Sequence, residues 1–74
     1  MIEILTANGF IFDSYCSVCK NRYRVFKNPE KPGVEVKVHV SGNYFKAYKP
    51  NFQGRITQVA FGNADKLKQV IETL

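Results

Sequence analysis

Seven consecutive residues constrain the fold of this chain more than any other segment. From Val34 to Val40 the sequence reads Val-Glu-Val-Lys-Val-His-Val, so a β-branched residue occupies every second position. This period of two predicts a half-buried β-strand and excludes an amphipathic helix, whose period is about 3.6 residues. Pro29, Pro32 and Gly33 precede the run and favour a turn, so we expect the strand to begin at Val34.

The dipeptide Gly42-Asn43 predicts a tight hairpin after this strand, because glycine readily adopts the positive φ that two-residue hairpin turns require. The return strand then covers residues 44–49, and Pro50 ends it. A two-residue loop also fixes which residues of the two strands are opposite each other. The predicted pairs are Ser41 with Tyr44, Val40 with Phe45, His39 with Lys46, Val38 with Ala47 and Lys37 with Tyr48.

This pairing separates two faces of different character. One face is apolar and is expected to form the core; its residues are Val36, Val38, Val40, Phe45 and Ala47. The other face is polar, basic and aromatic and is expected to meet solvent or a ligand; its residues are Lys37, His39, Ser41, Tyr44, Lys46 and Tyr48.

The end of the chain predicts an amphipathic helix. Apolar residues recur at the helical spacing i, i+3, i+4, i+7; they are Leu67, Val70, Ile71 and Leu74. Asn63 is a good N-cap and Asp65 puts a carboxylate in the first turn, so the helix should start near Ala64. We expect its apolar stripe to pack on the valine face of the hairpin, because so short a helix is marginal in water alone.

Other segments complete an α+β fold. Residues 10–15 and 22–27 are predicted to pair as a second hairpin, and residues 55–61 to form a further strand whose faces the pattern does not assign. Residues 2–7 fit either a short helix closed by Asn8-Gly9 or a strand, and we favour the helix. The expected architecture is a small antiparallel sheet of four to five strands with the C-terminal helix, and the short N-terminal helix, packed on one face.

Length and composition indicate one small folded domain over residues 1–74. Hydrophobic residues make up 45% of the 74, which is too many for intrinsic disorder despite a net charge of +5. A core this small is marginal, so a homodimer stays open as a source of extra stability. No apolar run approaches the roughly 20 residues of a membrane span, and Glu3 does not suit a secretory leader. We therefore expect a cytoplasmic protein with no membrane partner.

The motif Cys16-Ser17-Val18-Cys19 invites a zinc interpretation, but structural zinc needs four ligands and His39 is the single histidine. We expect no metal and no cofactor in one chain, with at least one cysteine buried; a zinc shared between two chains through Cys16 and Cys19 stays open. Catalysis is not expected, because the sequence has neither a phosphate loop nor paired carboxylates. The enzymatic alternative is a metal-independent ribonuclease in which His39 exchanges protons.

Charge and aromatic content favour nucleic-acid binding. Residues 20–55 hold nine Lys or Arg against two Glu, and such a segment attracts polyanions. Single-stranded nucleic acids are held by cations along the backbone and by rings on which bases stack. The predicted site residues are Arg22, Arg24, Phe26, Lys37, His39, Tyr44, Lys46 and Tyr48, the first three on condition that their strand lies beside the hairpin. The alternative is a protein-interaction or structural domain that uses the same rings as anchors. The sequence does not distinguish DNA from RNA and indicates no base preference.

Overall fold

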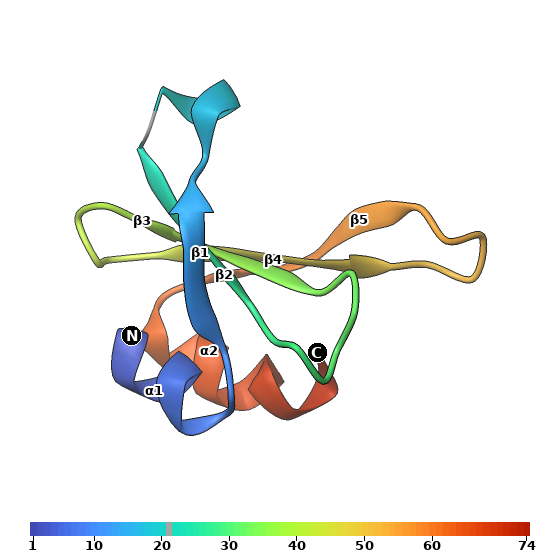
Figure 1. Cartoon of the computed structure of the whole chain (residues 1–74). Helices are drawn as coiled ribbons and strands as arrows, with labels where there is room; N and C mark the ends of the chain where they lie inside the picture. Colours follow the sequence, from blue (N-terminus) through green and yellow to red (C-terminus); the bar gives the residue numbers. More distant parts are fainter. Residues whose placement is uncertain (21) are drawn as a thin grey trace.

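The computed structural model describes residues 1–20 and 22–74, apart from the side chain of Cys19. In this part of the chain, five antiparallel strands form one sheet in the order β1-β2-β3-β4-β5, with helices at both ends of the sequence (Figure 1). The α+β architecture predicted from the sequence is confirmed. The elements are α1 (Ile2–Ala7), β1 (Ile11–Tyr15), the 3-10 turn η1 (Ser17–Cys19), β2 (Tyr23–Lys27), β3 (Glu35–His39), β4 (Phe45–Pro50), β5 (Ile56–Gly62), α2 (Ala64–Val70) and the 3-10 turn η2 (Ile71–Thr73).

Local signals set the ends of the two helices. Asn63 has an extended backbone, and its side-chain oxygen accepts the N–H of Lys66 at 3.1 Å, so α2 begins at Ala64 as predicted. α1 ends where Gly9 takes φ +86° and donates its N–H to the carbonyl of Thr6 at 3.1 Å. The N-terminal segment is therefore the helix that we favoured.

Both helices lie on the same face of the sheet and bury one apolar core against it (Figure 1). Phe45 and Leu67 have no exposed surface, and Val70 packs against the core from a partly buried position. The buried residues of the core are Leu5, Phe10, Phe26, Val34, Val36, Val38, Phe45, Ala47, Leu67, Ile71 and Leu74. Helix packing on the valine face of the hairpin is thus confirmed for every residue that we predicted there except Val40.

The β3–β4 register differs from the predicted one by two residues. Val38 pairs with Phe45, and Lys37 with Lys46, because the loop contains four residues, 40–43, in place of two. The loop closes when Gly42, at φ +78°, donates its N–H to the carbonyl of His39 at 2.8 Å. A shift of two residues keeps every strand residue on its predicted face, since side chains alternate with a period of two. Val40 and Ser41 leave the strand for the loop, where the side chain of Val40 is 43% exposed.

Bulges interrupt both edge strands. The register shifts between Phe12 and Ser14 in β1, and β5 has one extra residue, Val59, opposite the step from Ala47 to Tyr48 in β4. Bulges bend a strand and increase its twist. The β4–β5 hairpin extends well beyond the helices, and the β1–β2 hairpin rises away from them on another side of the molecule (Figure 1). Among the described residues, no helix has the length and apolar character needed to cross a membrane.

Candidate nucleic-acid interface

We call the face of the sheet that points away from both helices the open face. β3 and β4 place Lys37 directly opposite Lys46, and β5 places Phe61 on the other side of Lys46. β2 brings Tyr23 opposite His39. The open face carries Tyr23, Lys37, His39, Tyr44, Lys46, Tyr48, Gln58 and Phe61. Five of the eight predicted site residues therefore lie together.

Three rings form a compact cluster at one end of the open face. The rings of His39 and Tyr44 stack with centroids 4.7 Å apart and planes 15° apart. Tyr23 meets both rings edge-on, at 5.2 Å from His39 and 5.9 Å from Tyr44, and its hydroxyl donates to the Tyr44 hydroxyl at 3.1 Å. Edge-to-face and offset-stacked pairs are the favourable arrangements for aromatic rings. The cluster therefore holds Tyr44 in one orientation at the surface.

The two opposed lysines are held by aromatic rings. The ammonium of Lys37 lies 4.8 Å from the centroid of the Tyr48 ring, and that of Lys46 lies 5.1 Å from the centroid of the Tyr23 ring. Such cation–π contacts contribute about 0.5 to 1 kcal/mol at exposed sites. They partly offset the repulsion between like charges that face each other across two strands. The result is a local concentration of positive charge on a surface of rings.

The protonation states around Lys46 suit an anionic ligand. Side-chain hydrogen bonding to Tyr23 and the charge of that residue when ionised raise the pKa of Lys46. The pKa of Tyr44 is also raised, first by its hydrogen bond with Tyr23 and then by desolvation, while the charges of Lys46 and Arg22 oppose the rise. At neutral pH the lysine is therefore cationic and the tyrosine uncharged.

His39 has a structural role that bears on the ribonuclease hypothesis. Its Nδ1 lies 2.8 Å from the Ser41 hydroxyl and accepts the backbone N–H of Ser41 at 3.1 Å. Protonation of Nδ1 would break the bond to the backbone N–H, because that nitrogen would then be a donor. His39 thus stabilises the turn after β3 and one side of the ring cluster.

Three predicted site residues lie elsewhere. The strand β2 does lie beside β3, as the hypothesis required, but the pairs are Arg24 with Val38 and Phe26 with Val36. Phe26 is consequently buried in the core, and Arg24 points to the helix side of the sheet. Arg22 precedes β2 and is exposed, and its charge reaches Tyr44. Of the three, Arg22 alone remains a candidate contact.

Two aromatic residues of the open face were missed. Tyr23 takes the place that we had given to Phe26, and the alternation within β2 had separated these two residues without indicating which faced the ligand. Phe61 was not assigned because the alternation in β5 is blurred. Its ring is 67% exposed and lies across from Lys46, which makes it the most accessible ring on this face.

Cys16 is buried beside Tyr23 and Val25, in a small cluster separate from the main core. This agrees with the expectation that at least one cysteine is buried. The structure describes no group of three or more His, Cys, Asp or Glu side chains that could hold a metal ion. The side chain of Cys19 lies outside the described residues, so a zinc shared between chains stays a hypothesis.

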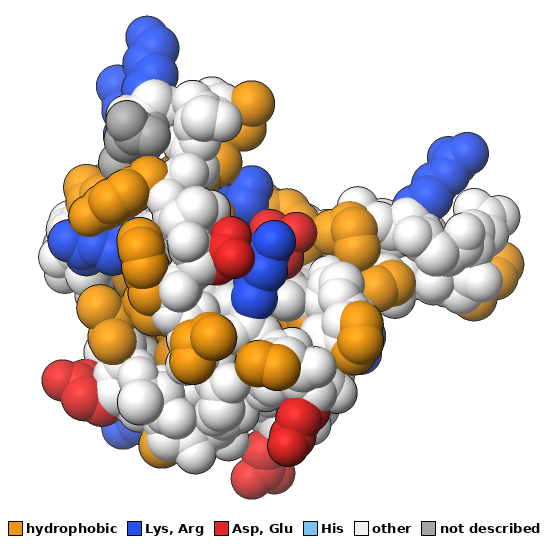
Figure 2. All heavy atoms as spheres, viewed as in Figure 1, with side chains coloured by type: hydrophobic (Ala, Val, Ile, Leu, Met, Phe, Trp, Pro, Cys, Tyr) orange, Lys and Arg blue, Asp and Glu red, His pale blue; other side chains and the backbone are white. Residues whose placement is uncertain are grey.

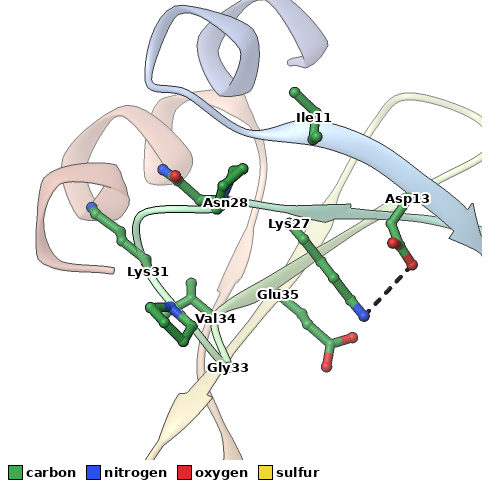
Figure 3. A pocket seen from close by; sticks show the side chains of 10 residues that line it. Ile11, Asp13, Lys27, Asn28, Lys31, Gly33, Val34 and Glu35 are labelled. Atoms are coloured by element: carbon green, nitrogen blue, oxygen red, sulfur yellow. Dashed lines mark ion pairs between the residues drawn. The ribbon is translucent and has the colours of Figure 1, made fainter.

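A cavity of about 350 Å³ lies at the opposite end of the sheet, where β1, β2 and β3 meet the loop of residues 28–34 (Figure 3). Asp13 and Lys27 point toward each other across its rim and form an ion pair at 3.6 Å, with Glu35 nearby. The buried Asn28 donates to the carbonyl of Asn8 and accepts the N–H of Glu30. Mixed charges and internally bonded polar groups make this cavity a weaker candidate for a polyanion than the lysine pair.

No family model, curated protein or solved structure matches this chain.

Proposed function

We propose that the open face binds single-stranded nucleic acid. The observation that carries the proposal is the direct opposition of Lys37 and Lys46, bordered by Tyr44, Tyr48 and Phe61. Two lysines opposite each other weaken a folded sheet slightly, and a phosphate between them removes the repulsion. Phe61 lies beside Lys46 on the adjacent strand, and Tyr44 and Tyr48 lie two residues before and after Lys46 along the chain, so rings surround the lysine. Bases stack on such rings without strong sequence preference.

The ligand class follows from the shape of the surface. Its lysine pair lies on β3 and β4, beside β5, so the surface suits a flexible strand laid across these three strands. A double helix presents its phosphates outward and keeps its bases stacked inside, so the exposed rings would have no partner there. A protein partner is the alternative, because exposed aromatic residues and cations also mark protein interfaces. The predicted cytoplasmic location is consistent with either ligand.

The test is a salt titration of binding to a fluorescent oligothymidylate, followed by fluorescence anisotropy. If Lys37, Lys46 and Arg22 each neutralise a phosphate, log K should fall against log salt with a slope of about −2, since each contact contributes about 0.7 for single strands. Lys46→Ala should weaken binding and flatten this slope by about 0.7. Lys68→Ala, which removes an exposed lysine from the helix side, is the matched control and should leave binding unchanged.

Ring variants test the second half of the proposal. Phe61→Ala should weaken binding by about 1 to 3 kcal/mol and leave the salt slope as it was, because stacking releases no counterions. Tyr44→Ala should behave alike, but it also disturbs the ring cluster, so Phe61→Ala is the cleaner measurement. Equal slope changes from lysine and ring variants would indicate attraction without stacking. Absence of binding at about 50 mM salt would instead favour a protein partner.

A further inference from the structure

The outer edge of β5 has few of the features that usually keep a sheet edge from pairing. β5 is the last strand of the described sheet, so the backbone N–H and C=O groups on its outer side have no neighbouring strand. It is seven residues long and contains no charged residue and no proline. Natural proteins protect such edges with charges, proline, short strands or bulges. Of these devices β5 has the bulge at Val59 alone.

The opposite edge of the sheet is protected. β1 has five residues, and its bulge contains Asp13, which forms an ion pair with Lys27. A carboxylate at the edge strongly disfavours addition of another strand, because a new strand would desolvate it. Both edge strands expose apolar side chains, which on β1 are those of Ile11, Phe12 and Tyr15, but β1 also carries this acid whereas β5 carries no charge. β5 is therefore the edge that a further strand can join at lower cost.

Exposed apolar side chains follow β5. Ile56, Val59 and Phe61 are all exposed large hydrophobic residues, with Val59 at 48%. A groove of about 370 Å³ runs along residues 58–61 and is closed on one side by Lys66 from α2. In Figure 2, hydrophobic side chains lie at the base and near the tip of the projecting β4–β5 hairpin, and a Lys or Arg side chain stands out from it. An added strand would thus find backbone partners and apolar contacts together.

We propose that β5 pairs antiparallel with β5 of a second copy of this chain, around a two-fold axis near Val59. Two chains of net charge +5 repel each other over most of their surface. Pairing through β5 instead places two uncharged strands side by side. Antiparallel pairing also brings the Arg55 end of one strand beside the end that leads to the partner's Asp65 and the partner's Lys66, whose charges sum to zero. The neutral edge of one copy therefore meets the same neutral edge of the other.

The pairing has a consequence for the open face. The two-fold axis of two antiparallel strands in one sheet is perpendicular to the sheet, so both open faces lie on the same side and both helix layers on the other. The lysine pairs and rings of the two copies then form one longer surface. The dimer itself needs no nucleic acid, so it can be tested apart from the proposed function.

The experiment is sedimentation velocity of the complete chain without nucleic acid, over a series of protein concentrations and at two salt concentrations. We expect a species of twice the chain mass of 8.5 kDa. Its dissociation constant should fall as salt rises, because salt screens the repulsion between two chains of net charge +5 while the paired strands themselves are neutral. Val59→Lys puts like charges on either side of the two-fold axis and removes an apolar contact, so it should raise that constant at least about tenfold.

The matched control is Ile11→Lys, which adds the same charge to the β1 edge at a residue that is also exposed and lies near Asp13 and Glu35. It should leave the dimer intact. Circular dichroism of each variant verifies folding, which neither exposed substitution should change. A wild-type chain that stays monomeric, a Val59→Lys variant that still dimerises, or a dimer that Ile11→Lys disrupts would each overturn the proposal. Nucleic-acid binding by a wild-type monomer would overturn the dimer and leave the proposed function standing.

Discussion

Replacing Gly33 by Ala tests how closely the loop of residues 28–34 approaches the β4–β5 hairpin. A Cβ at Gly33 would lie 2.6 Å from Cγ and 3.2 Å from Cδ of Pro50, and 3.4 Å from Cδ1 of Ile56. The proline ring is too rigid to move aside as a long side chain would. Gly33 also has φ +84°, a conformation that strains any residue with a Cβ. Gly42→Ala is the matched control, because it shares a positive φ of +78° but its Cβ would meet no atom within 4 Å.

The two variants separate backbone strain from steric overlap. Both should lose about 1 to 2 kcal/mol of unfolding free energy from the left-handed conformation. Gly33→Ala should lose about 1 to 3 kcal/mol more from overpacking, against a total of about 4 to 11 kcal/mol for a domain of this length. The measurement is urea unfolding followed by far-ultraviolet circular dichroism. Adding Pro50→Ala should restore part of the loss in Gly33→Ala. Equal losses in the two single variants would refute the close approach of Gly33 to Pro50.

Two further predictions concern the core and the alkaline limit. Phe45→Ala should destabilise the chain by about 3 to 5 kcal/mol, because Phe45 is fully buried. Val40→Ala should change stability by less than about 0.5 kcal/mol, because Val40 lies in the exposed loop. Midpoints of urea unfolding compare the two variants, and similar losses would contradict the four-residue loop. The pKa values of Lys46 and Tyr44 are both higher in the folded chain than in the unfolded chain, where they lie near 10. The stability that these two groups contribute is therefore fully present below the unfolded pKa values and is lost as pH rises through the folded ones. Tyr23→Phe should lower the Lys46 pKa in an NMR titration, and an unchanged value would show that Tyr23 is not the cause.

The predicted faces of the β3–β4 hairpin are correct although the predicted loop length is wrong, because the loop is longer by an even number of residues. The sequence signal Gly42-Asn43 identified the hairpin correctly but not the number of loop residues, because a glycine with positive φ serves two-residue and four-residue loops alike. A change of two residues in the loop moves every pair along and leaves each side chain on its own face. Had the loop contained three residues, the valines would have shared a face with Tyr44, Lys46 and Tyr48, so that burying the valines would have buried Lys46 as well.

The same reasoning could not be extended to β2, where two assignments were equally regular. Tyr23 and Val25 alternate with Arg24 and Phe26, so either pair could have joined the open face. The choice depends on which residue lies opposite His39, a contact between strands that the long loop of residues 28–34 leaves undetermined. In the folded chain Phe26 takes the core side of β2 and fills space beneath the helices. Tyr23 would fill that space less favourably, because its hydroxyl would be buried in an apolar core.

The bulge in β5 explains why the alternation of the sequence did not assign Phe61 to the open face. A regular strand would place Ile56, Gln58 and Ala60 on one face and Val59 with Phe61 on the other. In the structure the extra residue Val59 reverses the alternation, so Ala60 turns toward the core while Phe61 joins Ile56 and Gln58 on the open face. No residue pattern in β5 predicts this bulge. It is identified only from the pairing of β5 with β4. One inserted residue thereby sets the exposed ring of Phe61 beside Lys46 and leaves Val59 without a partner residue in β4 and 48% exposed, so Phe61→Ala and Val59→Lys test the two consequences of a single irregularity.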